Sequence, residues 1–475
     1  MSDESSWVGW SIAAPLLGAL VSLLAGRRGS IVGAFAAMGT LFCVATVVRQ
    51  SAARGTVRHP VGGWGAPLGI DLRADGLAAL LLATFAVVGP LIAVHASGYY
   101  RRPHRRSGFY CLSLFAWAGF NALVLSSDLF NLYVTLELLT LVAVALIVLE
   151  TRRDALAAGL DYLLLSLLGS LFYLFGVALL YAVAGTLDAQ LLATRLVPGP
   201  LVWTALSVIT LGLCLKAGLF PLHAWLPPAY VNASAPVSAL LSGLIGKAPY
   251  VVLLRLYLET FRTIVRPELA GLLGVLGAAG VAWGSVLALR QRRLKQVLAY
   301  SSLAHAGYLF LVFPIASPRA FTGAVYVAVS HASASASMFV AAGCIERSIG
   351  RDDLDRLKGL AHRRPLTFFA LGLAGTSLMG LPPSGGFVAK WYLARAALES
   401  GQWWWTVVVL GGSLMAAGYV FPILRSAFMP LSRGTHLRPI APRTELASLA
   451  LAIVAITLGL APEAPLALLD VEGRP

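Results

Sequence analysis

The stretch LGLCLKAGLFPLHAWLPP, residues 211–228, places a lysine and three prolines inside an apolar segment long enough to cross a membrane. Proline interrupts the main-chain hydrogen bonds of a helix, and a break at membrane depth is tolerated only where protein or a wet cavity surrounds it. A lysine at the centre of a span costs about 2.5–3.5 kcal/mol on insertion scales. Lys216 therefore predicts a functional site at a broken helix.

Two further segments repeat this combination. Residues 380–390, GLPPSGGFVAK, form a second break, and we expect Lys390 to terminate that broken helix and to mirror Lys216. Residues 241–257, LSGLIGKAPYVVLLRLY, carry Lys247 shortly before a proline, which predicts a kink at this lysine. Paired interrupted helices in the two halves of a chain are typical of inverted-repeat transporters.

Composition and hydropathy indicate an all-α polytopic membrane protein. Of the 475 residues, 58% are hydrophobic and only 12% are charged, whereas about a quarter of a soluble domain is charged. Apolar runs of spanning length predict about fourteen transmembrane helices, with helices 7 and 12 broken. The expected spans cover residues 7–25, 31–48, 77–97, 109–126, 129–149, 156–184, 202–230, 236–258, 270–289, 297–315, 319–345, 366–394, 403–428 and 446–461.

The net charge of +15 comes mainly from arginines in short loops. Positive loop charge sets membrane topology and attracts anionic lipid, so this excess predicts contact with a lipid bilayer and not with nucleic acid. Most of the loop cations, among which we count Lys295, follow odd-numbered spans. This bias predicts that the odd loops face the cytoplasm and that both termini lie on the outer side of the membrane.

No sequence pattern indicates a cofactor, a metal ion or a reaction centre. The four cysteines lie singly in apolar stretches, without the Cys or His spacing of metal sites. No nucleotide-binding motif occurs either. We expect no cofactor, no metal ligand and no catalytic residue in this chain, so any redox or hydrolytic chemistry would belong to a partner.

Glu137 lies in the middle of the fifth expected span and needs a partner or water at that depth. Lys216, in the same half of the chain, is the natural candidate. A carboxylate beside an ammonium favours both charged forms, whereas burial disfavours both, so a small change in separation or hydration moves a proton on or off the lysine. The pair predicts a protonation switch. A static structural ion pair is the alternative, although a buried pair is rarely an efficient stabiliser.

His305 and His331 are further candidate proton carriers, because histidine changes its charge near neutral pH. The alternative is a hydrogen-bonded core histidine. Ser335 lies one turn beyond His331 in a serine-rich stretch suited to holding water, although small residues also serve helix packing. Asp161, about one turn into the sixth span, and His223, beside the first break, are auxiliary candidates.

Four segments in order resemble the antiporter-like proton-conducting subunits of respiratory complex I, a family that includes subunits of Mrp-type cation/proton antiporters and membrane-bound hydrogenases. The likeness covers about residues 70–430 and is closest to the Mrp and hydrogenase branch. The segments are DLFNLYVTLE (128–137), LKAGLFPLHAWLPPAYVNASAPVSALLSGLIGK (215–247), LKQVLAYSSLAHAGY (294–308) and LPPSGGFVAKWYLA (381–394).

The resemblance implies two inverted five-helix repeats inside a fourteen-helix protein. Helices 4–8 would occupy residues 109–258 and helices 9–13 residues 270–428, flanked by helices 1–3 in residues 1–108 and by helix 14 with a tail in residues 445–475. The resemblance also assigns the proton pathway, and its residues here are Glu137, Lys216, Lys247, His305, His331 and Lys390. This chain departs from the family at Ser335, where relatives carry a lysine, and at Asp161, where they also carry one.

The expected function is that of a proton-translocating membrane subunit of a larger ion-pumping complex in a prokaryotic plasma membrane. Its partners would be other membrane subunits, including homologous antiporter-like ones. The transported ion is the proton, with Na⁺ as the alternative. Two other functions stay open. One is a partly inactive structural subunit, because Ser335 stands where relatives carry a lysine. The other is the proton-driven membrane subunit of an inorganic-carbon accumulation system.

Overall fold

The computed structural model describes residues 5–430 and 438–470, most of them in long helices. Thirteen helical segments in these ranges are long and apolar enough to cross a membrane. They are α1 (Ser6–Leu24), α2 (Gly29–Arg54), α3 (Gly76–Tyr99), α4 (Pro103–Leu125), α5 (Leu129–Ile147), α6 (Arg153–Ala184), α8 (Pro200–Ala217), α10 with α11 (Ala235–Gly243 and Ala248–Arg255), α12 (Pro267–Arg290), α13 (Leu294–Leu309), α15 (Pro318–Ile349), α19 (Trp404–Phe428) and α20 (Pro442–Leu460). The remaining expected span consists of two shorter helices, α17 (Pro365–Met379) and α18 (Gly385–Glu399). The prediction of an all-α polytopic membrane protein is confirmed.

The smaller elements lie between and after the spans. They are β1 (Val57–Pro60), β2 (Asp71–Ala74), α7 (Ala189–Arg195), α9 (Leu226–Asn232), α14 (Val312–Ile315), α16 (Leu360–Arg363) and α21 (Glu463–Asp470). The strands β1 and β2 pair antiparallel, with Val57 opposite Ala74. Neither this hairpin nor α21 is predicted from the sequence, and the last part of the expected C-terminal tail, residues 471–475, lies outside the described residues.

Both broken spans end their first half at a glycine. α8 stops at Gly218 (φ 67°) and α17 at Gly380 (φ 75°), in a backbone region that residues with a Cβ rarely adopt. In each case the N–H of the next residue bonds to a carbonyl five residues back, at 3.0 and 3.1 Å. The chain then resumes as α9 and α18. The two breaks expected from the density of proline and glycine are therefore present.

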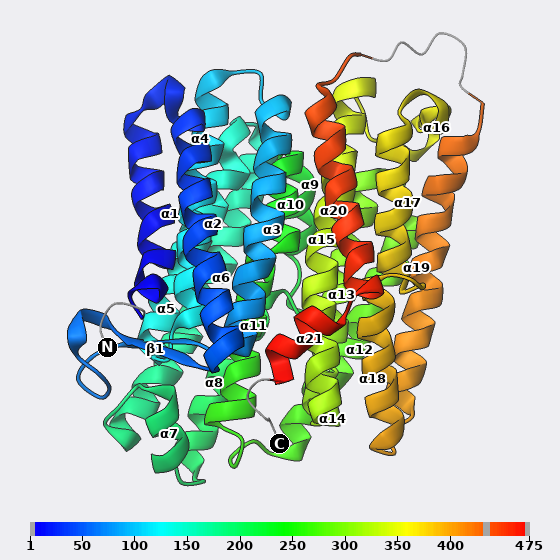
Figure 1. The fold of residues 1–475 in the computed structure, drawn as a ribbon. Coiled ribbons are helices and arrows are strands. Elements are labelled where there is room, and N and C mark those ends of the chain that lie inside the picture. The colour runs from blue at the N-terminus through cyan, green and yellow to red at the C-terminus, as the bar shows by residue number, and fades with distance from the viewer. Residues whose placement is uncertain (1–4, 431–437, 471–475) are drawn as a thin grey trace.

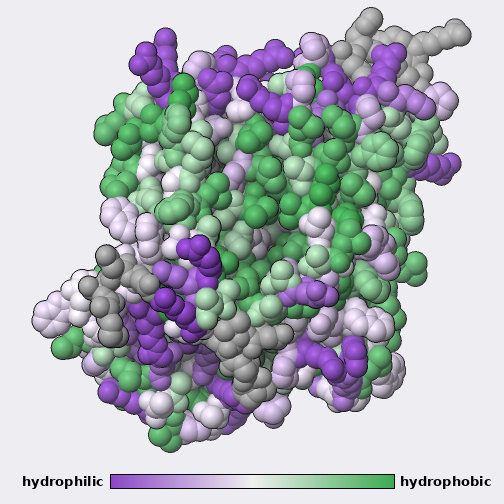
Figure 2. All heavy atoms as spheres, in the orientation of Figure 1, coloured by the Kyte–Doolittle hydropathy of each residue, from purple (hydrophilic) through white to green (hydrophobic). Residues whose placement is uncertain are grey.

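The long helices stand side by side (Figure 1). β1, α7 and α14 lie toward the lower end of the molecule in this view, whereas α16 and the start of α4 lie at the upper end. Figure 2 shows a broad green hydrophobic zone across the middle of the same face, with purple hydrophilic residues above and below it. An apolar zone of this kind over spanning helices is the surface that a lipid bilayer covers.

Two isolated main-chain bridges occupy matching places in the two halves of the chain. Asp128 pairs with Asp188, which links the loop after α4 to the loop after α6, and Arg293 pairs with Asp353, which links the loop after α12 to the loop after α15. The first bridge adjoins α7 at the lower end and the second precedes α16 at the upper end (Figure 1). This relation supports the inverted five-helix repeats, which stay a prediction.

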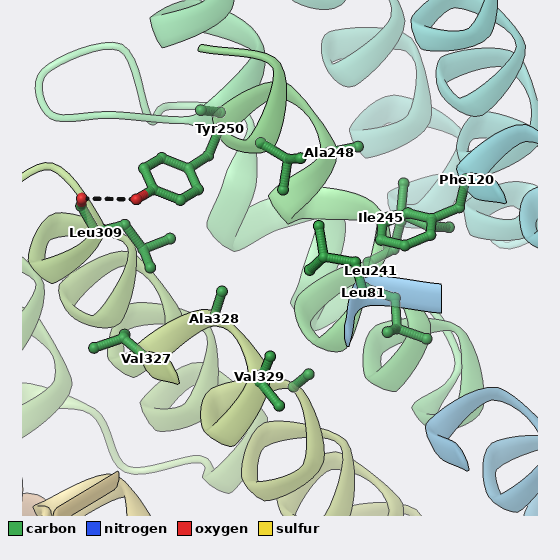
Figure 3. Packing of buried hydrophobic residues seen from close by; sticks show 14 of the residues in the cluster. Leu81, Phe120, Leu241, Ile245, Ala248, Tyr250, Leu309, Val327, Ala328 and Val329 are labelled. Atoms are coloured by element: carbon green, nitrogen blue, oxygen red, sulfur yellow. Dashed lines mark hydrogen bonds between the residues drawn. The ribbon is translucent and has the colours of Figure 1, made fainter. Parts of the chain in front are cut away.

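The span made by α10 and α11 is largely buried, and Figure 3 shows its packing from close by. On one side Ile245 lies beside Phe120 of α4, and on the other Tyr250 donates a hydrogen bond to the main-chain oxygen of Leu309 at 3.0 Å. α15 passes close to this span, and the 18-residue apolar window of α15 is fully buried. Lys247, between α10 and α11, is thus enclosed by protein, as a cation at membrane depth requires.

Charged residues fasten the start of α3 to the end of α11. Asp75, which is 0% exposed, accepts hydrogen bonds from Arg255 at 2.7 and 2.8 Å and from Arg73 at 2.7 Å. Glu259 also bonds Arg73 and lies 3.8 Å from Arg255. Burial alone would raise the pKa of Asp75, but the two arginines outweigh it and hold the pKa well below its usual range. The sequence analysis does not find this cluster.

We predict that Asp75→Asn lowers the free energy of unfolding by about 3–5 kcal/mol, because it removes the bidentate carboxylate partner of the buried Arg255. Since the folded pKa of Asp75 is lowered, its contribution is fully present above the ordinary aspartate pKa of about 4 and is lost as the pH falls toward the folded value. Unfolding of the detergent-solubilised protein at neutral and acidic pH measures both effects.

The matched control is Asp353→Asn. Asp353 lies 3.8 Å from Arg356 with both side chains exposed to solvent, so its replacement should change stability by about 0.5 kcal/mol or less. Equal losses in the two variants would contradict a structural role for the Asp75 cluster.

Candidate functional site: a buried row of ionisable side chains

Glu137 and Lys216 form an ion pair between α5 and the last turn of α8. The Nζ atom of Lys216 lies 2.8 Å from Oε1 of Glu137 and 3.1 Å from Oγ1 of Thr140, which is one turn further along α5. Ser170 of α6 donates a hydrogen bond to the same carboxylate. The Lys216 side chain is 3% exposed and that of Glu137 is 17% exposed, so the carboxylate borders the protein surface. The partner expected for Glu137 is confirmed.

The main chains of α6 and α8 touch beside this pair. A Cβ on Gly169 of α6 would lie 2.8 Å from the oxygen of Gly212 and 3.0 Å from Cγ of Lys216. A Cβ on Gly212 would likewise meet the oxygen of Gly169. Only glycine leaves room for this approach, because protein interiors are close-packed. The aliphatic stem of Lys216 therefore lies directly against the backbone of α6.

Lys247 ends a 3-10 turn, Ile245–Lys247, that separates α10 from α11. Its Nζ donates hydrogen bonds to the main-chain oxygens of Ser242 and Gly243, at 2.5 and 2.8 Å. These are the last carbonyls of α10, and carbonyls at a helix C-terminus lack intrahelical partners and carry partial negative charge. The kink expected at Lys247 is present, and it supplies the acceptors for the ammonium.

Serine hydroxyls cluster next to Lys247. The hydroxyl of Ser242 is 2.8 Å from that of Ser302 on α13, and it also hydrogen-bonds Ser335 on α15. Each of the three is 6% exposed or less. Ser335 therefore belongs to a hydroxyl network between three spans, rather than standing alone beside His331.

The two histidines lie on the other side of a small cavity. The rings of His305 and His331 are 4.7 Å apart. A cavity of about 30 Å³ is lined by both rings and by Lys247, and it reaches Ala217 at the end of α8, next to Lys216. A space of this size is large enough for a water molecule, and Lys247, Ser302 and the histidines offer polar partners in a largely apolar lining. The cavity thus contacts Lys247 and both histidines directly, and it lies next to Lys216 through Ala217.

Lys390 lies in the second turn of α18, so the prediction that it terminates the second broken helix and mirrors Lys216 is wrong. The helix resumes earlier than the proline and glycine density suggests, because Ser384 caps its start by accepting the N–H of Phe387 at 3.2 Å. The ammonium nevertheless points back at the break. It donates hydrogen bonds to the oxygens of Leu378 and Met379, the last two residues of α17, at 2.9 and 3.2 Å.

His305 connects the central cavity to Lys390. Its Nε2 is 3.0 Å from the same Leu378 oxygen that Lys390 binds, and its Nδ1 is 2.8 Å from the oxygen of Ser301. The Nζ of Lys390 also lies 4.9 Å above the ring of Tyr308. One main-chain oxygen is thus shared by an imidazole and an ammonium.

The two auxiliary candidates lie outside the row of ionisable side chains, which consists of Glu137, Lys216, Lys247, His305, His331 and Lys390. Asp161 is exposed on α6, among leucines that face away from the protein. His223 is half-buried between α8 and α9 and stacks on Phe220, with the ring centroids 5.6 Å apart. The structure brings neither of them to Lys216, Lys247 or Lys390.

Lys295 is the buried cation that the sequence analysis misplaces. The sequence predicts a loop position for it, but it lies in the first turn of α13, is 4% exposed and donates a hydrogen bond to the main-chain oxygen of Ala233. The residues that bury it come from distant parts of the chain, so no local pattern distinguishes it from the loop arginines before it.

The described ranges, 5–430 and 438–470, contain no group of three or more His, Cys, Asp or Glu side chains placed to hold a metal ion. What the row offers is one carboxylate, three ammonium groups and two imidazoles, separated by hydroxyls, main-chain oxygens and a cavity that fits water. Ionisable groups in this arrangement inside a membrane are suited to passing protons.

Removing one partner of the Glu137–Lys216 pair is predicted to cost more stability than removing both. Glu137→Gln leaves a buried ammonium without its carboxylate and should lower the free energy of unfolding by about 3 kcal/mol, whereas Glu137→Gln combined with Lys216→Met should lose less. Unfolding measurements on the wild type, both single variants and the double variant give the coupling energy. Additive losses would contradict the ion pair.

The comparisons with known proteins identify the family of this chain. A family model described as "NADH:quinone oxidoreductase/Mrp antiporter, TM" matches residues 126–416, a range that contains the whole row. The NADH-quinone oxidoreductase subunit N of Desulforudis audaxviator is 38% identical, over 87% of this chain and 84% of its own length. A subunit of the Na⁺/H⁺ antiporter of Alkalihalophilus pseudofirmus is 29% identical, over 84% of this chain and 81% of its own.

A solved structure extends the likeness to the fold. A chain of the Mrp complex from Dietzia sp. matches with a TM-score of 0.91 and 27% identity, covering 99% of this chain and 97% of that one. Sequence and structure thus lead to the same group of membrane proteins. The chain belongs to the NADH:quinone oxidoreductase/Mrp antiporter family of antiporter-like membrane subunits.

Proposed function

We propose that this protein translocates protons as an antiporter-like subunit of a larger ion-pumping membrane complex. The observation that carries the proposal is the buried ion pair of Glu137 and Lys216, 2.8 Å apart at a helix break. A pair of this kind is a poor stabiliser and an expensive feature of a span, so its presence favours a functional use. The proton pathway consists of Glu137, Lys216, Lys247, His305, His331 and Lys390.

The first step of the mechanism is a switch at Lys216. While Glu137 is in contact, the carboxylate stabilises the ammonium. If the two helices separate or the carboxylate turns away, the ammonium loses its counter-charge in surroundings of low polarity and releases its proton. Thr140, which accepts a hydrogen bond from the ammonium at 3.1 Å, keeps the amine in place during this change.

The proton then passes through the centre of the protein. The cavity of about 30 Å³, which Ala217 lines next to Lys216, is large enough for a water that would receive the proton and pass it to Lys247 or to the histidine pair. From His305 the proton would pass to Lys390 directly or through a water, because the oxygen of Leu378, which both groups bind, holds them close together but only accepts hydrogen bonds. Each transfer moves one proton between neighbouring bases and forms no other bond.

The hydroxyl network at Ser335 supports conduction through the second half and also defines the second candidate function. Ser242, Ser302 and Ser335 bridge α10, α13 and α15 where relatives were expected to place a lysine. Hydroxyls donate and accept hydrogen bonds and can relay a proton with water. Without such a relay, this half would serve as structural support for a channel confined to the first half.

The setting proposed for the protein follows from its relatives. They are named as subunits, which supports assembly with other membrane subunits, including homologous ones, in a prokaryotic plasma membrane. The loop charges support an orientation with both termini outside. Residues 109–258 and 270–428 would be the two repeats, flanked by residues 1–108 and 445–475. Nitrogen bases suit protons better than Na⁺, which prefers oxygen ligands.

The role in an inorganic-carbon accumulation system stays an alternative, because the channel in that case would be the same. The proteins that co-purify with this chain decide between the two settings.

We predict that Lys216→Ala abolishes proton uptake, because it removes the switchable base at the break. Proton movement into vesicles that contain the complete complex, followed with a pH-sensitive dye, measures this. Lys358→Ala, which removes a lysine outside the spans, is the matched control and should transport normally. Normal uptake with Lys216→Ala in a correctly assembled complex would refute the proposed function.

A separate prediction concerns the second half. If the row conducts throughout, Lys390→Ala should reduce proton uptake as strongly as Lys216→Ala, because every proton passes both amines. The same vesicle assay, with subunit composition checked by gel, compares them. Full uptake with Lys390→Ala beside lost uptake with Lys216→Ala would favour the structural role for the second half.

A further inference from the structure

A large cavity lies at the lower end of the molecule, and we call it the lower cavity. Its volume is about 1220 Å³, whereas ordinary small-molecule pockets have volumes of about 300–1,000 Å³. Its wall combines α7 and the turn after α11, from the first half of the chain, with α14, α15 and α19, from the second half. Figure 1 shows α7 and α14 at this end. None of the six residues of the proposed proton pathway lines the lower cavity.

The wall carries one positive charge in excess. Arg73 and Arg255 line the lower cavity, but both belong to the Asp75 cluster, in which two carboxylates balance their charges. Arg262 also lines the cavity, is exposed and forms no ion pair with any residue that the structure describes. The charge of Arg262 is therefore available to an anion.

Most of the remaining wall is apolar. Phe313, Phe321 and Trp405 border the lower cavity, and each is 8% exposed or less. These rings come from α14, α15 and α19, whereas the arginines come from the first half of the chain. A cavity with a charged wall and an aromatic wall fits an amphiphile, which has a polar head and an apolar body.

The lower cavity adjoins the lipid-facing surface. Trp403 and Trp404 stand at the start of α19 with 61% and 47% of their surface exposed, and Trp404 also lines the cavity. Exposed tryptophans at the end of a span are typical of the level of lipid headgroups. From this level, exposed apolar side chains continue along α12 and α19, namely Leu272, Val275, Val407 and Leu410. The amphiphile present in such surroundings is a phospholipid.

Two irregular pieces of backbone shape the wall. The turn Leu256–Thr260 is π-helical, and Ala316 has a φ of 46°, which is unfavourable for a residue with a Cβ. Such irregularities are concentrated at functional sites. Here they lie away from the proposed proton pathway, which points to a separate use of this end of the protein.

We propose that the lower cavity binds one anionic phospholipid, with its phosphate at Arg262 and its acyl chains against Phe313, Phe321 and Trp405. The excess charge of the wall matches the single negative charge of phosphatidylglycerol, whereas phosphatidylcholine is neutral overall. Because the wall comes from both halves of the chain, the bound lipid holds the two halves together. The inference does not depend on proton translocation. The alternative occupant, a segment of a neighbouring subunit, is an outcome of the last test.

The first test compares ligands. The full-length protein is freed of lipid in detergent, and its unfolding temperature is measured with phosphatidylglycerol, with phosphatidylcholine of the same acyl chains, or with inorganic phosphate. A ligand that binds the folded state stabilises it, so phosphatidylglycerol should raise the unfolding temperature more than either of the others at equal concentration. Equal effects of the two lipids would overturn the choice of an anionic lipid, and an equal effect of phosphate would overturn the part of the acyl chains.

The second test removes the excess charge. Arg262→Gln should weaken the binding of phosphatidylglycerol about tenfold or more, because hydrogen bonds to charged groups are the strong ones. Arg266→Gln is the matched control, since Arg266 is also exposed but packs over the ring of Trp203, at 3.6 Å, and does not line the cavity. Native mass spectrometry during a lipid titration measures the affinity and should show one tightly bound lipid per chain. Unchanged affinity in Arg262→Gln would contradict the position of the phosphate.

The third test fills the cavity. Gly271 of α12 lines it, and a Cβ added to Gly271 would have no atom within 4 Å. Gly271→Phe should therefore fold normally, while its ring displaces the bound lipid. Gly411→Phe is the matched control, because Gly411 of α19 also has open space but lies outside the lining. A lipid retained equally by both variants would overturn the site.

The last test identifies the occupant in the complete complex. A photoreactive phenylalanine analogue in place of Phe321 should crosslink to a phospholipid, which mass spectrometry of the labelled chain detects. Crosslinking to another subunit would assign the lower cavity to a protein contact and overturn the lipid site. This result decides the question if Arg262→Gln does not fold. None of these outcomes alters the predicted effect of Lys216→Ala on proton uptake, so the two proposals fail separately.

Discussion

A buried ammonium must find acceptors inside the protein, and in this fold the acceptors come from the ends of broken helices. Lys247 binds the last carbonyls of α10, Lys390 binds the last carbonyls of α17, and Lys295 binds the oxygen that follows α9. A continuous helix would have kept these oxygens for its own N–H groups. At these three positions the end of a helix supplies the acceptors that the buried ammonium needs. The partial negative charge of a helix C-terminus adds to the attraction.

Lys216 is the exception, and the difference matters for how the two halves work. Its break begins at Gly218, just beyond it, and its partner is a carboxylate on another helix. A carboxylate can move away from an amine, whereas main-chain oxygens are fixed by their helix. Lys216 thus depends on a side-chain carboxylate, whereas Lys247 and Lys390 bind main-chain oxygens. A displacement of α5 or α8 would therefore change the ion pair of Lys216 without directly changing the acceptors of Lys390.

The spans, both breaks and the partnership of Glu137 with Lys216 could be predicted, because each leaves a local mark in the chain: an apolar run, a cluster of proline and glycine, or a charge in an apolar run. The position of Lys390 within α18 could not, since the helix restarts at a capping serine that looks like any other loop residue. Lys295 and the Asp75–Arg255 cluster were missed for a different reason. Their partners are 62 and 180 residues away, and only the fold brings them together.

The contact between Gly169 and Gly212 has a mechanical consequence. With no side chain between the two backbones, α6 and α8 have no soft layer that could absorb a small movement of one against the other. The stem of Lys216 rests on the same surface. A displacement of α6 toward α8 would therefore press directly on the side chain of Lys216. The helices α6 and α8 can thus move as one rigid unit that includes the side chain of Lys216.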